Sequence, residues 1–345
     1  ADVVMLSDHD WALTVLCDAA PALTRKAGAK ETGELLVKML TLVYEPAKPV
    51  DPKAPQAAPP AAAAGTPVGA ARVESATAMD VLRAIQRAHI KLEGAQVDAV
   101  KKMLTAMDTE VRSAALELLL SSRPDDVAAI VEAGLKDAAP EVRLAALTRA
   151  GRLPAAAQAG LLKAAAKDSE AQVRAEAMYA TRNLGDAAPA REILSAGLND
   201  ASPAVVTAAA RGVTMHPDLA LGDAVCGVLN KHSAPAAEAV PSVLALIDAA
   251  VALRAKNAPG TLMLLMAGSN ADVRAAAAAG LGRLRTANSV PALLTALQDK
   301  EPTVSAAALD ALGEIDSPQA RQATLAALQS KDLPAAARQK ILLAA

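Results

Sequence analysis

The chain has 345 residues, a net charge of −2 and a pI near 6.2, so no general basic field draws it to nucleic acid or to an anionic membrane surface. Hydrophobic residues make up 53% of the chain but aromatic residues only 1%, with no Phe, and alanine fills about a quarter of it. An all-β protein needs β-branched and aromatic side chains on its strands, so this composition favours an all-α fold.

Residues 1–44 are expected to form two short helices. Trp11, the only tryptophan, lies in the first, where a place in a core and a role as a docking anchor explain it equally well. The second, Glu31 to Tyr44, carries its large apolar residues on one stripe. Seven prolines then interrupt an Ala-rich background, which predicts an extended or disordered linker over residues 45–74. We therefore expect residues 1–44 to be a docking element on a tether.

Residues 75–345 are expected to form a series of helical hairpins. Their main sequence feature is a Val-Arg pair that recurs at a nearly constant interval, which is typical of a solenoid. The pair occurs at Val111-Arg112, Val142-Arg143, Val173-Arg174 and Val273-Arg274, with decayed copies at Val205-Val206 and Val304-Ser305. In four units an aspartate stands before the valine in the turn between two helices: Asp137, Asp168, Asp200 and Asp299.

Over residues 95–345 this pattern resembles HEAT repeats, and especially the short Asp/Val-Arg subtype found in HEAT-like phycobilin lyases and many bacterial repeat proteins. The resemblance implies a right-handed α-solenoid of about seven to eight HEAT-like helical hairpins. The N-terminal helical pair on its Pro/Ala-rich linker would precede the array. Such repeats serve scaffolds, adaptors, regulators and a few enzymes, so the resemblance is specific for the fold and not for the function.

The recurring arginines are better explained as structural residues than as an anion-binding row, because a repeated position performs a repeated structural task. The resemblance implies that the aspartates and arginines form a ladder of hydrogen bonds between neighbouring units. This structural ladder would comprise Asp137, Asp168, Arg112, Arg143, Arg174 and Arg274, together with Asp200 and Asp299. Val206 and Ser305 cannot supply an arginine, so we expect changed curvature there, or a partner that makes up the difference.

A second set of arginines lies late in successive second helices, which by family resemblance line the concave face. These candidates for partner binding are Arg149, Arg152, Arg182, Arg211, Arg283 and Arg285. The corresponding residues near the two ends of the array are acidic (Glu117, Asp310 and Glu314). An ordinary solvated helix face, with cations that complement the helix dipole, is the favoured alternative.

No catalytic, cofactor-binding or metal-binding residues are predicted. The four histidines lack metal-ligand spacing, Cys17 and Cys226 form neither a metal motif nor a disulfide framework, and no phosphate-binding loop or nucleophile elbow is present. No apolar run of about 18 to 20 residues predicts a membrane span, and no signal peptide is recognised. We therefore expect a cytoplasmic protein, although a leader that has already been cleaved stays open.

We expect a non-enzymatic scaffold for protein–protein interactions, or a structural subunit of a larger assembly, whose partners are other proteins. One alternative is a HEAT-like enzyme. A DNA-glycosylase-like enzyme would need a basic groove with aromatic residues, of which the array offers only Tyr179, and a bilin-lyase-like activity rests on the repeat subtype alone. Another alternative is a nucleic-acid-binding solenoid, whose binding would weaken steeply with salt.

Overall fold

The computed structural model describes residues 20–22, 24–26, 28–43, 68–122, 126–151, 153–184, 187–216, 221–232, 235–315 and 317–329. All regular structure within these residues is helical, which confirms the expected all-α fold. The contacts divide the chain into two compact units, Ala1–Leu153 and Pro154–Ala345. Each unit is described by itself.

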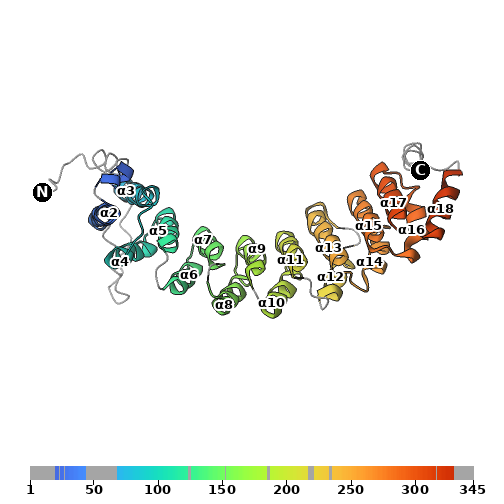
Figure 1. The fold of residues 1–345 in the computed structure, drawn as a ribbon, viewed down its shortest axis with the longest axis horizontal. Coiled ribbons are helices and arrows are strands. Elements are labelled where there is room, and N and C mark those ends of the chain that lie inside the picture. The colour runs from blue at the N-terminus through green and yellow to red at the C-terminus, as the bar shows by residue number, and fades with distance from the viewer. Residues whose placement is uncertain are drawn as a thin grey trace, which may run out of the picture. The chain divides into compact units, whose positions relative to one another are not determined.

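Unit 1 contains two helical hairpins and a pair of helices that precedes them (Figure 1). Its helices are α2 (Ala29–Val43), α3 (Val68–Arg87), α4 (Ala95–Lys102), the 3-10 turn η1 (Met103–Thr105), α5 (Thr109–Ser122), α6 (Val127–Leu135) and α7 (Pro140–Ala150). The hairpins are α4/α5 and α6/α7. Helix α3 packs on α5, and α5 packs on α7, so these three helices follow one another along one side of the unit.

Unit 2 contains five consecutive hairpins, α8/α9 to α16/α17, and a further helix, α18. Its helices are α8 (Ala155–Ala165), α9 (Ala171–Ala180), η2 (Thr181–Asn183), α10 (Ala187–Gly197), α11 (Pro203–Met215), α12 (Gly222–Leu229), η4 (Ala237–Ala239), α13 (Val240–Ala252), α14 (Ala258–Leu265), α15 (Ala271–Leu284), η5 (Ala287–Ser289), α16 (Val290–Ala296), α17 (Pro302–Glu314) and α18 (Pro318–Gln329). The second helices α9, α11, α13, α15 and α17 pack on one another in order, so they form one layer.

The first helices form the opposite layer, in which α8 packs on α10, α12 on α14 and α16 on α18. The outward surface of the second-helix layer is called the second-helix face below, in unit 1 as in unit 2. Seven hairpins lie within the described residues, which agrees with the number expected from the sequence. A residue's position in its hairpin therefore decides whether it lies in the core, in a turn or on one of the two faces.

The second helices begin where the sequence places a proline or a turn aspartate. Pro140, Pro203 and Pro302 occupy first-turn positions of α7, α11 and α17, where the missing N–H costs no hydrogen bond. In α15 the side chain of Asn270 caps the helix by accepting the Val273 N–H at 3.1 Å. The local sequence thus fixes the helix starts before any tertiary contact is made.

The core of both units consists mainly of Ala, Val and Leu side chains, which allow neighbouring helices to approach closely. The α15–α17 contact is the tightest example. A Cβ added to Gly282 would lie 2.6 Å from the Cα of Ala311, so only glycine fits this crossing. The scarcity of aromatic residues follows from this packing, because a large ring would hold the helix axes apart.

Helix α2 packs against α3 and α4, with Leu36 and Leu40 fully buried. These two residues of the apolar stripe expected on a docking element are therefore covered by unit 1 itself, whereas Leu35 is exposed. Helix α3 begins at Val68, earlier than the expected end of the linker at residue 74, because the segment after Pro67 is rich in alanine and contains no further proline. The division into docking element, linker and array stays a prediction.

Candidate functional site

The arginines of the Val-Arg pairs are used by the fold. Arg112, Arg174 and Arg274 each donate through Nε and Nη2 to the two carboxylate oxygens of an aspartate in the next hairpin, at 2.7 and 2.9 Å. The acceptors are Asp137, Asp200 and Asp299, respectively. This two-pronged geometry is the strongest form of an Arg–carboxylate contact.

The remaining nitrogen, Nη1, of each arginine donates hydrogen bonds to carbonyl oxygens in the turn of its own hairpin. In Arg174 it donates to the carbonyl oxygens of Asp168 and Ser169 at 2.9 and 3.0 Å, and in Arg274 to those of Gly268 and Ser269. Arg143 does the same with the carbonyls of Asp137 and Ala138. One guanidinium therefore ties a turn to its own helix and, in three cases, to the next hairpin.

The aspartates have two tasks as well. Besides accepting the arginine, Asp137, Asp200 and Asp299 each accept the backbone N–H two residues later, at 2.8 or 2.9 Å, which shapes the turn before the second helix. Asp168 makes the same turn with Glu170. The hydrogen bond from the arginine lowers the pKa of Asp200 and of Asp299. Burial raises the pKa of Asp137, but the hydrogen bonds from Arg112 and Ala139 outweigh it.

Where the ladder residues are missing, small or apolar side chains fill the position. Val206 stands in place of the arginine in α11 and is buried. Ser305 does so in α17, where it is buried and donates to the Pro302 carbonyl of its own first turn. These layers are thus closed by packing and by local hydrogen bonds.

Two arginines of the second set contact the neighbouring second helix. Arg211 on α11 donates to the Tyr179 hydroxyl on α9 at 3.0 Å. Arg283 on α15 pairs with Asp248 on α13 at 3.1 Å, where both side chains are more than half exposed. Such an exposed pair contributes little to stability, about 0–1 kcal/mol.

The other members of this set differ in their surroundings. Arg182 is exposed in η2. Burial raises the pKa of Glu176, and the positive charge of Arg182 offsets part of this rise. Arg285 is exposed and has a left-handed backbone conformation (φ 53°) at the end of α15. The side chain of Arg149 on α7 makes no hydrogen bond or ion pair within the described part of the chain. Arg152 and Trp11 lie outside the described residues.

Arg149 lines a groove on unit 1, which has a volume of about 300 Å³. Helix α3 and the turn that follows it form one wall, and α5 forms the other. The remaining lining residues are Ile85, Gln86, His89, Ile90, Lys91, Glu117, Leu118, Ser121 and Ser122. Sequence reasoning singled out Arg149 but not His89 and Lys91, because only the packing of α3 on α5 brings that turn beside α7.

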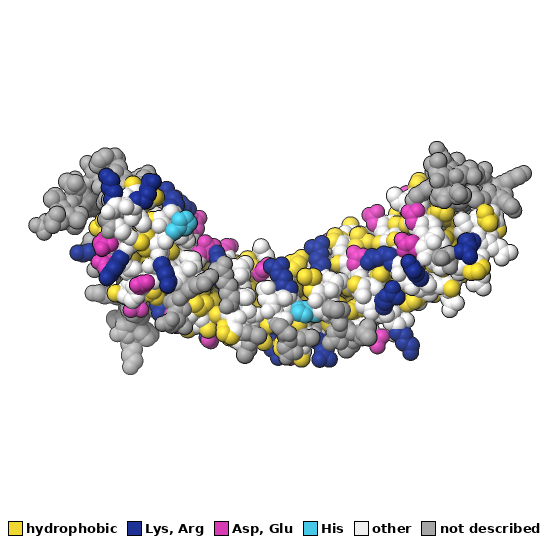
Figure 2. Space-filling model, in the orientation of Figure 1, with side chains coloured by type: hydrophobic (Ala, Val, Ile, Leu, Met, Phe, Trp, Pro, Cys, Tyr) yellow, Lys and Arg dark blue, Asp and Glu magenta, His cyan; other side chains and the backbone are white. Residues whose placement is uncertain are grey.

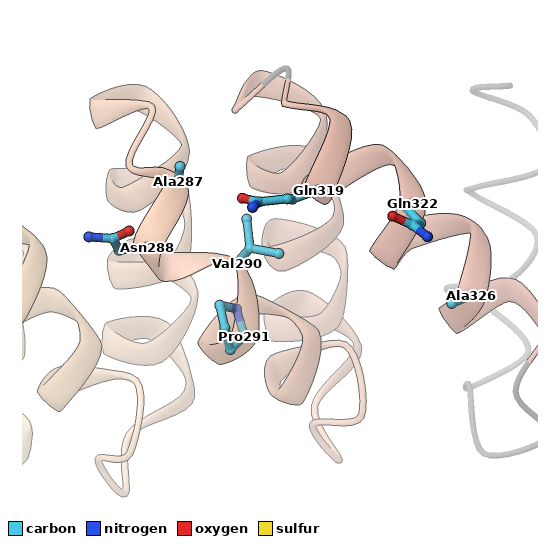
Figure 3. A pocket seen from close by; sticks show the side chains of 7 residues that line it. All are labelled: Ala287, Asn288, Val290, Pro291, Gln319, Gln322 and Ala326. Carbon is cyan, nitrogen blue, oxygen red and sulfur yellow. The ribbon is translucent and has the colours of Figure 1, made fainter.

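A second, larger cleft of about 640 Å³ lies on the first-helix side of unit 2, between η5, α16 and α18. Its floor contains Val290 and Pro291, and Gln322 and Ala326 of α18 line its far side (Figure 3). The side chain of Gln319 reaches over Val290, whereas Asn288 points away from the other lining residues. The cleft has no charged lining residue, and no sequence feature predicted it.

Charge is mixed over the surface. Figure 2 shows Lys and Arg side chains interspersed with Asp and Glu on the visible face of each unit. Among the residues that the structure describes, no three His, Cys, Asp or Glu side chains are grouped in a way that could hold a metal ion. None of the described helices is long and apolar enough to cross a bilayer.

Family models match two parts of the chain. Residues 258–344 match the model described as HEAT repeats, and residues 120–148 match a HEAT repeat associated with sister chromatid cohesion. The first match covers the hairpins that contain the Arg274–Asp299 pair, and the second covers α6 and part of α7. The chain contains HEAT repeats in these two parts, and its described helices form the stacked hairpins of an α-solenoid.

Two solved structures match the chain in a comparison of structures, both at low sequence identity. A crystal structure of a Kap121p mutant has 10% identity and a TM-score of 0.54, and the match covers 95% of this chain and 43% of that one. A crystal structure of YibA from E. coli has 18% identity and a TM-score of 0.48, covering 73% of this chain and 92% of that one. The chain has no match among curated proteins. At these identities the likeness to Kap121p concerns the fold alone.

Proposed function

We propose that this HEAT-repeat solenoid is a non-enzymatic scaffold or structural subunit that binds other proteins through its second-helix faces. The observation that carries the proposal is the different use of its two sets of arginines. The N–H donors of Arg112, Arg174 and Arg274 are taken up by hydrogen bonds within the fold. Those on the second-helix faces, such as Arg149 and Arg182, lie on exposed or half-exposed surface where a partner can reach them.

The surface chemistry supports a protein partner rather than a nucleic acid. Arginines on the second-helix face of unit 2 alternate with acidic groups, since Asp248 on α13 and Glu314 on α17 lie beside the arginines of α15. A polynucleotide needs a continuous basic strip, and its affinity rests on the number of phosphates that are neutralised. A face of mixed charge instead favours a protein surface with complementary mixed charge.

Affinity purification with mass spectrometry tests the proposal. The intact protein is compared with the charge-reversed variant Arg182→Glu/Arg211→Glu, which changes two neighbouring second helices of unit 2. The matched control is Lys231→Glu/Lys256→Glu, which makes the same change in charge at exposed turns outside that layer. Far-UV circular dichroism establishes that all three proteins are equally helical.

We expect the face variant to lose specific partners that the intact protein and the control retain. The proposal is overturned if all three proteins capture the same partners, or if nuclease treatment of the extract removes every specific partner. The second result would favour a nucleic-acid-binding solenoid. Because α2 packs within unit 1, deletion of residues 1–73 would damage the fold of that unit, so we do not expect it to report on docking alone.

A further inference from the structure

Three features coincide in the groove on unit 1: basic side chains without a partner, apolar residues at its base, and a left-handed backbone conformation on its rim. Its basic residues come from two elements: His89 and Lys91 from the turn after α3, and Arg149 from α7. None of the three makes a hydrogen bond or ion pair through its side chain within the described residues. Glu117 is the single acidic lining residue, and it is not paired with any of them.

The floor of the groove is apolar and rigid. Ile85, Ile90 and Leu118 are at most 4% exposed, so they present only a small apolar surface at its base. Ser122 fixes the two walls to each other: its hydroxyl accepts the Leu92 N–H at 3.3 Å and donates to the Leu118 carbonyl at 3.0 Å. A groove with fixed walls is ready for a ligand without a loss of entropy from ordering them.

His89 has a left-handed backbone conformation, with φ of 52°. It ends α3 by donating its N–H to the Gln86 carbonyl, while the next N–H, that of Ile90, reaches back to the Ile85 carbonyl. Glycine is the usual residue at such a helix end, and an L side chain is strained there. The same left-handed helix end occurs at Arg254 and Arg285; after α3 it places an imidazole on the rim of the groove.

We infer that this groove binds an acidic segment of a partner protein, a short stretch in which carboxylate side chains alternate with aliphatic ones; the inference rests on the proposed function. The carboxylates would accept hydrogen bonds from Arg149, Lys91 and His89, and an aliphatic side chain would cover the floor. The volume of about 300 Å³ lies at the lower end of the range for ligand pockets, so it suits side chains of a peptide and not a folded domain.

The test measures the binding of fluorescein-labelled peptides to the full-length protein by fluorescence anisotropy at low salt. The probes are Glu-Leu-Glu-Leu-Glu-Leu, its neutral counterpart with Gln in place of Glu, and a labelled single-stranded oligo-dT. The groove variants are Arg149→Gln and Lys91→Gln, each of which removes one cation with little change in shape. Lys102→Gln is the matched control, because Lys102 is exposed on α4 and does not line the groove.

We expect the acidic peptide to bind at least about tenfold more tightly than the neutral peptide, and each groove variant to weaken it about fivefold to tenfold, which corresponds to one charge-assisted hydrogen bond. The control should keep the affinity of the intact protein. Equal binding of the two peptides, equal loss in Lys102→Gln, or tighter binding of oligo-dT than of the acidic peptide would each overturn the inference.

The two proposals fail separately. If the groove variants bind the acidic peptide normally while Arg182→Glu/Arg211→Glu still loses its partners, the inference about the groove is wrong and the proposed function stands. If the groove variants lose the peptide and every partner is retained by the charge-reversed protein, the groove binds its ligand but the second-helix face of unit 2 does not act as proposed.

Discussion

Replacing Arg274 by Met tests whether the Arg–Asp ladder joins neighbouring hairpins. Met retains most of the apolar stem of arginine, so the substitution removes the guanidinium with little loss of packing. Four hydrogen bonds are lost: two to Asp299 and two to the carbonyls of Gly268 and Ser269. The side chains of Arg274 and Asp299 are only 8% and 14% exposed, so the carboxylate is left poorly solvated and without its partner.

Removing one partner of a buried ion pair costs about 3–5 kcal/mol, and we expect a loss of unfolding free energy in this range for Arg274→Met. The control is Arg283→Met, the same chemical change in the same helix. Its pair with Asp248 is 51% and 68% exposed, and we expect a loss of about 0–1 kcal/mol. Adding Asp299→Asn to Arg274→Met should restore part of the loss, because it removes the uncompensated charge.

Urea unfolding followed by far-UV circular dichroism measures the total change. Because repeat arrays do not always unfold in one step, hydrogen exchange of α15 and α17 provides the local measurement. We expect protection to fall in the turn before α17 and in α17 itself. A loss below about 1 kcal/mol for Arg274→Met, or a loss equal to that of Arg283→Met, would refute a role of the ladder in joining hairpins.

Three further predictions concern stability. The pKa of Asp200 is lowered in the folded protein, so its carboxylate stabilises the fold fully above its unfolded pKa of about 3.9 and loses this contribution as the pH falls through the lower folded value. The unfolding free energy of Asp200→Asn, measured with urea, should therefore vary less with pH in that window than that of the intact protein. The same pH dependence in both proteins would contradict this. Gly282→Ala should lower the unfolding free energy by about 1–3 kcal/mol, because the added Cβ would meet the Ala311 backbone. Gly160→Ala, which has open space around it in α8, should raise it by up to about 1 kcal/mol. Equal effects of the two substitutions on thermal unfolding would refute the packing argument. Arg254 follows α13 with φ of 47°, a conformation in which an L side chain is strained. Arg254→Gly should therefore raise the unfolding free energy by about 0.5–1 kcal/mol, whereas Arg254→Ala should not. Equal unfolding free energies of the two variants would show that the left-handed conformation carries no strain.

The ladder explains why some arginines of this protein are poor candidates for partner contacts although they recur so regularly. A guanidinium has five N–H donors, and in Arg174 the turn and the next hairpin take up four hydrogen bonds. An arginine on the second-helix face has the same donors but fewer acceptors from the fold. Position in the hairpin, and not residue type, therefore separates structural arginines from those that can bind a partner.

The sequence alone determined the architecture. The spacing of the Val-Arg pairs, the turn aspartates and the prolines at helix starts are local features, and a helical hairpin packs mainly on its neighbours in the chain. Periodicity was therefore sufficient to predict an all-α solenoid and the number of its hairpins. The resemblance to HEAT repeats also implied a ladder of hydrogen bonds between neighbouring units, of which the contact of Arg112 with Asp137 is one.

Only the tertiary structure decided where the groove of the proposed peptide site forms. The groove brings together the turn after α3, the end of α5 and Arg149 of α7, residues that are far apart in the chain and follow no repeat. The burial of Leu36 and Leu40 on α2 has no sequence signal either, because it depends on which helices pack beside them. Repeats thus determine the framework, whereas departures from the repeat, positioned by packing, determine the sites.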